Sequence, residues 1–338
     1  MTEGLKYPSA RKYPSASTRE DRPVPILVTG VHRNGTTWVG KMLAAGSQVG
    51  YISEPLNINH RPGVLRVPVE RWYTYICEEN ESNYLPALQE MLRFRYHAWS
   101  EIQALHSGKD LARMGRDGLI FLRGRLTKQR PLIKDPFALF SIPWFIQRLE
   151  CQVVVTVRHP AAFVSSLKRL NWAFQVEDLL AQPLLMHDWL SPFQRDMESI
   201  ITGSEAAEAS AQAHAAIIDR ACLVWRMAYQ VVDILRQKFP QILVVRHEDL
   251  SLDPLAGYRA LYTGLGLNFT PAVQKAILKS SSADNPKEVS KQNIFSTRID
   301  SRANLANWKQ RLTSQEVRRV RQMTESIAAL YYPDFAWD

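Results

Sequence analysis

The stretch TGVHRNGTTW, from Thr29 to Trp38, constrains the fold more than any other part of the chain. It follows the apolar run VPILV and leads into WVGKML, where apolar residues recur at helical spacing. A strand, a glycine loop and a helix in this order form an anion site, because the loop amides and the positive end of the helix dipole meet there. The alternative is a turn that uses glycine for its geometry alone.

The loop departs at one position from the triphosphate-binding pattern G-x-x-x-x-G-K-[ST]. Gly30, Gly35 and Thr37 fit the pattern, whereas Thr36 stands where the lysine belongs. That lysine reaches the β and γ phosphates, so its absence argues against transfer of a γ-phosphate. Arg33 is then the strong cation of the turn, and we expect the loop to bind a 5′-phosphate.

Two further apolar runs extend this pattern into an α/β fold. Residues 152–157 read as a strand with Pro160 placed to open a helix, and a strand near 241–246 follows a helical stretch from 217 to 238. Such alternation predicts a central parallel sheet covered on both faces, in one three-layer domain over residues 23–338. Residues 68–107 and 170–204 read as helical insertions around a substrate pocket.

Composition narrows the class of protein. The 338 residues are 46% hydrophobic, which excludes a wholly disordered chain, and 42 Lys and Arg against 33 Asp and Glu give a charge of +9 that suits an anionic ligand. No concentrated Lys/Arg run with interleaved aromatic residues is present, so a nucleic-acid-binding module is disfavoured. Residues 1–22, which repeat KYPSA, are expected to form a flexible tail.

The lack of recognisable targeting signals and the spacing of the cysteines favour a cytoplasmic protein. No apolar stretch approaches the roughly 18 residues of a membrane span, and the N-terminus does not resemble a signal peptide. Three widely spaced cysteines suggest neither a disulfide framework nor a zinc cluster, which fits a reducing compartment.

A second motif lies about 120 residues after the loop. VVVTVRHPAAFVSSL places Arg158 at the end of a strand and Ser166 eight residues later. The two motifs together resemble those of the sulfotransferases that use 3′-phosphoadenosine 5′-phosphosulfate (PAPS). The resemblance implies that Arg158 and Ser166 bind the 3′-phosphate, that Trp38 either stacks on adenine or belongs to the core, and that the 5′-phosphosulfate is held by Arg33, Asn34, Gly35, Thr36 and Thr37.

Two residues at strand ends are candidates for the chemistry, which needs a base and a cation near the bridging oxygen but no metal. GYISEPLN places Glu54 after a short strand, and PLIKDPF places Lys134 at the end of another. The tyrosylprotein sulfotransferases are similar in both stretches, which implies Glu54 as general base and Lys134 as the group that stabilises the leaving nucleotide. Many cytosolic members carry a histidine base where this chain has Pro136. A turn carboxylate and a surface lysine are the structural alternatives.

The C-terminal stretch DSRANLANWKQRLT resembles the family segment that closes over the 3′-phosphate, although its Arg-Lys-Gly part is not intact. Ser301 and Arg302 are the nearest candidates there, while Trp308 and Leu312 are expected to pack. RHEDL at residues 246–250 is read as structural, and the histidines suggest no metal site. The acceptor could be a carbohydrate, lipid, small alcohol, phenol or peptide tyrosine. The competing interpretation is a small-molecule kinase with a displaced lysine, with Asp249 as its magnesium ligand.

Overall fold

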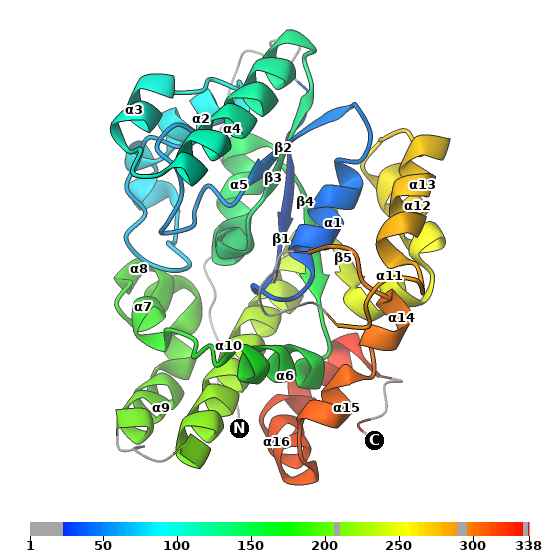
Figure 1. Ribbon diagram of the computed structural model, residues 1–338. Coiled ribbons are helices and arrows are strands. Elements are labelled where there is room, and N and C mark those ends of the chain that lie inside the picture. The colour runs from blue at the N-terminus through cyan, green and yellow to red at the C-terminus, as the bar shows by residue number, and fades with distance from the viewer. Residues whose placement is uncertain (1–22, 206–209, 289–295, 334–336, 338) are drawn as a thin grey trace.

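A computed structural model describes residues 23–205, 210–288, 296–333 and 337 (Figure 1). Its centre is a five-stranded, all-parallel sheet in the order β2-β3-β1-β4-β5. The strands are β1 (Ile26–Thr29), β2 (Val49–Ser53), β3 (Arg130–Lys134), β4 (Gln152–Val157) and β5 (Leu243–Arg246). The predicted parallel α/β fold is confirmed. The predicted tail, 1–22, lies outside the described residues, and the domain boundary at residue 23 stays a prediction.

Helices cover both faces of the sheet, as the continuous apolar strands require. Ile26 and Val28 of β1 pack with α1 (Thr36–Leu43), α12 (Pro254–Gly264) and α13 (Pro271–Ser281), whereas Leu27 packs on the opposite side. That second layer contains α5 (Ile142–Leu149), α6 (Pro160–Leu170), α10 (Ser210–Lys238) and α16 (Ser314–Tyr331). The chain therefore forms the three layers that the sequence predicts.

Further helices make up the insertions and the C-terminal region (Figure 1). Between β2 and β3 lie the 3-10 helix η1 (Glu78–Asn83), α2 (Leu85–Leu92), α3 (Ala98–Gln103) and α4 (Gly108–Leu126), and β3 is followed by η2 (Pro136–Ser141). After α6 come α7 (Val176–Leu180), α8 (Pro183–Leu185), η3 (Met186–Leu190), η4 (Ser191–Phe193) and α9 (Gln194–Glu205), and after β5 come α11 (His247–Leu252), α14 (Ser301–Asn304) and α15 (Asn307–Arg311). Within the described ranges, no helix is both long and apolar enough to cross a membrane.

The order of the strands decides where a ligand can bind. From β1 the chain passes to the edge strand β2 and returns to β3, which lies between β2 and β1. It then crosses to β4 and β5 on the other side of β1. In open parallel sheets the crevice at such a reversal, outside the carboxyl ends of the strands, is the usual ligand site. The glycine loop leaves β1 at this point.

Gly30 is the residue that lets the loop leave β1 so close to β4. Its φ of 142° lies in a region that side-chain-bearing residues rarely adopt. A Cβ on Gly30 would lie 2.5 Å from both the carbonyl oxygen and Oγ1 of Thr156 in β4. Only glycine fits between the two strands here.

We therefore expect Gly30→Ala to lower the free energy of unfolding by on the order of 1–3 kcal/mol, because the backbone must shift as well as bear strain. Urea denaturation of the full chain measures this. Gly115→Ala in α4 is the matched control, since a Cβ at Gly115 meets nothing within 4 Å. That control should gain about 0.5–1 kcal/mol from helix propensity. Equal stability of the two variants would refute the steric argument.

Candidate active site

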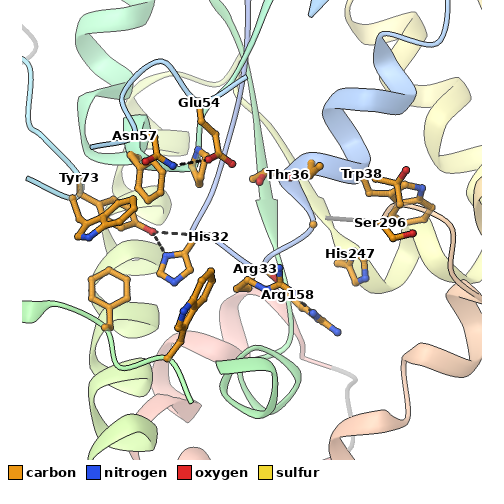
Figure 2. Close-up of a pocket in the computed structure, with 18 of the residues that line it drawn as sticks. His32, Arg33, Thr36, Trp38, Glu54, Asn57, Tyr73, Arg158, His247 and Ser296 are labelled. Atoms are coloured by element: carbon orange, nitrogen blue, oxygen red, sulfur yellow. Dashed lines mark hydrogen bonds between the residues drawn. The ribbon is translucent and has the colours of Figure 1, made fainter. Parts of the chain in front are cut away.

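A cavity of about 410 Å³ lies at the carboxyl ends of the strands (Figure 2). Each of the five strands is followed by a residue that lines it: His32 after β1, Glu54 after β2, Pro136 after β3, Arg158 after β4 and His247 after β5. The parallel sheet thus brings together side chains that are up to 215 positions apart in the sequence. The cavity has a cationic region near the glycine loop and an aromatic region beyond His32.

The glycine loop enters α1 through two residues with positive φ, Arg33 at 71° and Gly35 at 89°. Gly35 is the N-cap of α1, and Thr36 and Thr37, which begin that helix, line the cavity. The side chain of Asn34 instead points into the core, where its amide donates to the Tyr229 hydroxyl. The loop thus has the geometry of an anion site, with Asn34 as a brace.

The cationic region joins the two sequence motifs. Arg158 is 9% exposed, and its Nη1 donates to the carbonyl oxygen of Arg33 at 3.3 Å. The Nε of Arg33 in turn donates to Ser166 Oγ at 3.5 Å. Burial, and then the charges of Arg158, Arg169 and Arg311, lower the pKa of Arg33 to about 10. Cations packed this closely favour a multiply charged anion.

Glu54 and Lys134 meet at the ends of β2 and β3. The Lys134 ammonium is 2% exposed and donates to Glu54 Oε1, while the other carboxylate oxygen, Oε2, accepts from Asn57 Nδ2 at 2.8 Å. Glu54 has a φ of 50°, and its amide donates to the carbonyl oxygen of Lys134 at 2.7 Å, which fixes the turn after β2. The neighbouring Asp135 accepts from the amides of Leu56 at 2.6 Å and Phe137 at 2.9 Å, so it anchors this turn.

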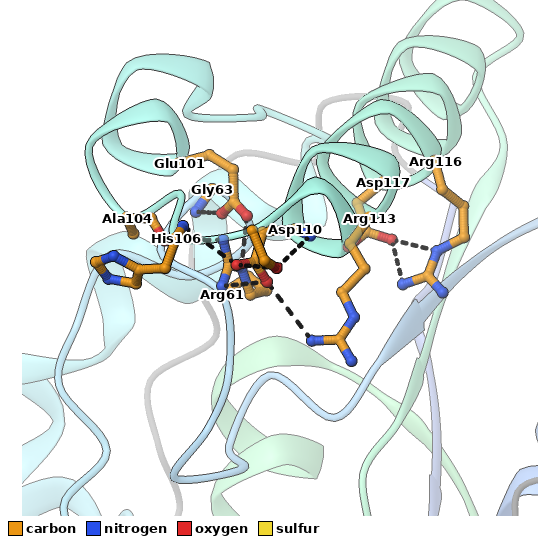
Figure 3. Close-up of polar contacts among 10 residues, drawn as sticks. Arg61, Gly63, Glu101, Ala104, His106, Asp110, Arg113, Arg116 and Asp117 are labelled. Atoms are coloured by element: carbon orange, nitrogen blue, oxygen red, sulfur yellow. Dashed lines mark hydrogen bonds and ion pairs between the residues drawn. The ribbon is translucent and has the colours of Figure 1, made fainter.

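The segment that follows Glu54 is tied to α3 and α4 by a polar cluster (Figure 3). Arg61 Nε donates to the buried carboxylate of Glu101 at 2.5 Å, and its Nη1 lies 3.4 Å from Asp110 Oδ1. Glu101 also accepts from the amide of Gly63 at 2.9 Å. These contacts hold the chain between Glu54 and the aromatic wall of the cavity in place.

The aromatic region is built from three separate segments. Trp72 and Tyr73 come from the insertion after β2, Phe137 from η2, and Trp172 and Phe174 from the insertion after α6. Figure 2 shows His32 directed into this group, with its backbone amide and Nδ1 at 3.1 and 3.0 Å from the Tyr73 hydroxyl. The sequence predicted a substrate pocket in these insertions, but it did not predict that His32 and Phe137, which lie outside them, would line the cavity.

Trp38 and His247 form the opposite end of the cavity (Figure 2). The Trp38 indole N–H donates to Ser280 Oγ at 2.9 Å, and its ring packs edge-on against His247 and Tyr258. Trp38 is thus both a core residue, 6% exposed, and a wall of the cavity. His247 is buried, and its Nδ1 has no hydrogen-bond partner among the described residues. Its place directly after β5 is the sequence signal that could have identified it.

The C-terminal segment differs in detail from the sequence interpretation. The Arg302 guanidinium donates to the carbonyl oxygen of Leu252 at 3.1 and 2.8 Å, and Arg302 is not among the residues that line the cavity. Asn304 of the same helix does line it, and Arg311 of the neighbouring α15 is one of the residues whose charges lower the pKa of both Arg33 and Arg158. A cofactor role for Arg302 therefore stays a prediction without a supporting contact.

Trp308, Leu312 and the RHEDL stretch have the structural roles that the sequence predicts. Trp308 and Leu312 are buried, as packing residues should be, and Glu248 of the RHEDL stretch accepts from the amide of His159 and the Tyr332 hydroxyl. Asp249, the magnesium ligand of the kinase interpretation, pairs with Arg246 and does not line the cavity.

Buried histidines give the protein a specific dependence on pH. Burial first, and then a neighbouring arginine, lower the pKa of His32, His159 and His247 to about 3. Because an unfolded histidine has a pKa near 6.5, their contribution to stability is complete above that pH and is lost as the pH falls toward 3. Burial raises the pKa of Asp135 to about 7 and also raises the pKa of Glu248, so these two carboxyls oppose the trend that the three histidines set.

We expect the free energy of unfolding to be lower at pH 5 than at pH 7.5, by at most roughly 2 kcal/mol per buried histidine. Urea denaturation at the two pH values measures the difference. His159→Asn should reduce it, whereas His106→Asn, at an exposed position, should leave it unchanged. A free energy of unfolding that is the same at both pH values would contradict the assignment of neutral buried imidazoles.

A parallel sheet whose glycine loop and clustered arginines meet at the switch point is typical of proteins that bind phosphorylated nucleotides. The family model for the sulfotransferase domain matches residues 23–331. The chain belongs to this family, and it is a PAPS-dependent sulfotransferase. The family membership replaces the kinase interpretation.

Solved structures that resemble the chain are also sulfotransferases. The sulfotransferase domain from the Synechococcus PCC 7002 olefin synthase is 17% identical, with 94% of this chain and 98% of that chain covered and a TM-score of 0.47. The domain from the curacin biosynthetic pathway is 15% identical, with coverages of 89% and 96% and a TM-score of 0.44. Mouse sulfotransferase SULT7A1 complexed with PAP is 12% identical, with coverages of 90% and 84% and a TM-score of 0.40. No curated protein matches the chain.

Proposed function

We propose that the cationic region holds the nucleotide, with the glycine loop and Arg33 at the 5′-phosphosulfate and Arg158 with Ser166 at the 3′-phosphate. The observation that carries this proposal is the contact between the two motifs, in which Arg158 donates to the carbonyl of Arg33 and Arg33 donates to Ser166. The buried Nε of Arg158 has no hydrogen-bond partner among the described residues, so a phosphate oxygen would satisfy it.

The bound nucleotide supplies the sulfuryl group, and the side chains of the chain orient and activate the acceptor. Glu54 takes the proton of an acceptor hydroxyl. Oε1 of Glu54 accepts one hydrogen bond from Lys134, and Oε2 accepts one from Asn57. Lone pairs on the two oxygens are therefore left for the acceptor hydroxyl. Lys134, buried beside Glu54, provides the positive charge that stabilises the oxygen of the departing nucleotide. Trp38 and His247 form the wall at the adenine end.

A cytoplasmic location and the independence from metal stay parts of this proposal. Cys77, Cys151 and Cys222 are all buried free thiols, which is compatible with a reducing compartment.

Isothermal titration calorimetry with 3′,5′-bisphosphoadenosine (PAP), in parallel with ATP plus magnesium, tests the nucleotide site. We expect PAP to bind without added metal and ATP to bind more weakly, because the arginine at the end of β4 meets a 3′-phosphate that ATP lacks. A preference for magnesium and ATP would overturn the proposed placement of the nucleotide.

A further inference from the structure

Helix α4 directs a stripe of leucines away from the body of the protein. Leu111, Leu119, Leu122 and Leu126 recur at helical spacing over about 22 Å, and each is between 54% and 73% exposed. Gly115 lies on the same side, and a Cβ there would meet nothing within 4 Å. Surface helices normally turn such a stripe toward the core. A contiguous apolar stripe in this position therefore indicates an interaction surface.

The opposite face of α4 fixes this orientation of the helix. Phe121 is buried and packs edge-on against Phe94, with 5.8 Å between the ring centroids. A Cβ on Gly124 would lie only 2.7 Å from the Phe94 ring, so the helix approaches the core closely at this point. Because these contacts hold the inner face of α4, the helix cannot rotate to bury the leucines instead.

Positive charges border the leucine stripe. Helix α4 carries five basic residues against two acidic ones, a net charge of +3. The acidic residues, Asp110 and Asp117, are already paired with arginines (Figure 3). Lys109, Arg123 and Arg125 are exposed and form no ion pair with another described residue. The helical period of 3.6 residues places Lys109 and Arg123 along one border of the stripe and Arg125 along the other.

This combination favours an anionic lipid surface over a protein partner. Helices with leucine on one side and Lys or Arg beside it lie in the plane of a lipid interface. Neither the active-site cavity nor a second cavity of about 550 Å³ is lined by a residue of α4, so the stripe offers no pocket for the anchoring side chain of a protein partner. A second copy of the chain would bring arginines against arginines, because both acidic residues of α4 are already paired.

The neighbouring helix α3 adds to the exposed apolar surface. It contacts α4, and it exposes Trp99 by 71% and Ile102 by 45%. Tryptophan is enriched where proteins meet the headgroup level of a bilayer, because its ring combines an apolar body with a polar N–H.

We propose that α4 docks the protein on an anionic lipid surface, with its leucines inserted at the level of the outer acyl chains and its unpaired cations against the headgroups. The net charge of +9 on the whole chain adds attraction to the same surface. This surface is separate from the cavity, so the inference goes beyond the proposed function and does not depend on where the nucleotide binds.

Flotation of the full chain with lipid vesicles tests the proposal. Vesicles of phosphatidylcholine with about 30% phosphatidylserine are compared with vesicles of phosphatidylcholine alone, each in low salt and in about 0.5 M NaCl. We expect the affinity for the anionic vesicles to be about 10-fold higher or more. It should fall by a similar factor in the higher salt, which screens the cations.

A pair of double variants tests the leucine stripe. Leu119→Gln with Leu122→Gln removes its centre and should weaken binding to the anionic vesicles about 10-fold or more. The matched control is Leu252→Gln with Leu278→Gln, which alters two leucines on α11 and α13 that are each 51% exposed. This control should leave the affinity unchanged.

A second pair tests the positive charges. Lys109→Gln with Arg123→Gln should weaken binding about 10-fold, whereas Lys275→Gln with Lys279→Gln on α13 removes the same charge and should change it less than about twofold. All positions in both pairs are exposed, so circular dichroism should show the helix content and cooperative unfolding of the unsubstituted chain.

Three outcomes would overturn the proposal. Binding that persists in the leucine variant would mean that charge alone holds the chain on the vesicle. Equal affinity for the neutral vesicles would exclude a role for the cations. If vesicles are not bound and light scattering shows a dimer that the leucine variant dissociates, a second copy of the chain covers the stripe. None of these results affects the nucleotide site, because PAP binding is measured separately by calorimetry.

Discussion

Glu54→Gln should lower kcat by about 10²- to 10⁴-fold, the range expected when a general base is removed. The amide keeps the size of the side chain and its oxygen can still accept from Lys134, but its nitrogen cannot accept from Asn57, and the side chain cannot take a proton. Glutamine is no better suited than glutamate to the positive φ of this position. The substitution should therefore leave the backbone of the turn unchanged. Turnover of an acceptor with radiolabelled PAPS measures kcat, and calorimetry with PAP should give a dissociation constant within about threefold of that of the unsubstituted chain.

The control for this prediction is another paired carboxylate. Glu90 pairs with Arg95 at 2.7 Å and His97 at 3.1 Å and does not line the cavity, so Glu90→Gln should leave kcat unchanged. If Glu54→Gln retains more than about a tenth of the original kcat, the base is another group. His32 is the neighbouring candidate, although a pKa of about 3 makes it a poor base at neutral pH.

Arg158→Ala should raise the dissociation constant of PAP about 30-fold or more, because truncating a buried charge in a charge-assisted hydrogen bond costs at least about 2 kcal/mol. The same substitution should change the affinity for adenosine 5′-phosphate little, since that ligand lacks the 3′-phosphate. Calorimetry of the variant with both nucleotides measures the two effects.

Arg302→Ala tests whether Arg302 binds the nucleotide, as the sequence predicts, or lies outside the nucleotide site, as its contacts in the structure indicate. Arg302 bonds to the carbonyl of Leu252 and does not line the cavity, so the substitution should leave PAP binding nearly unchanged. An equal loss of affinity for both nucleotides in Arg158→Ala would mean that Arg158 acts by supporting the loop at Arg33 and does not contact the 3′-phosphate. A large loss in Arg302→Ala would return that residue to the nucleotide site.

The sequence by itself determined the fold class and the position of the glycine loop. The run before Gly30, the positive-φ position at Gly35 and the helix that follows are local features, and local patterns depend on residues that are near in sequence. The places of Glu54, Lys134 and Arg158 at the edge of the sheet were predictable for a related reason. Each ends or follows a strand, and the ends of parallel strands meet at one edge of a sheet.

The tertiary structure alone decided which side chains meet across that edge. The pairing of Lys134 with Glu54, 80 positions apart, and the stacking of Phe174 on His32 depend on strand order and on how the insertions pack, and no periodicity in the sequence encodes either. The same holds for Arg311, whose charge reaches Arg33 where the sequence placed Arg302. A motif specifies what a loop can bind, whereas the aromatic region of the cavity arises from three segments that only the folded chain brings together.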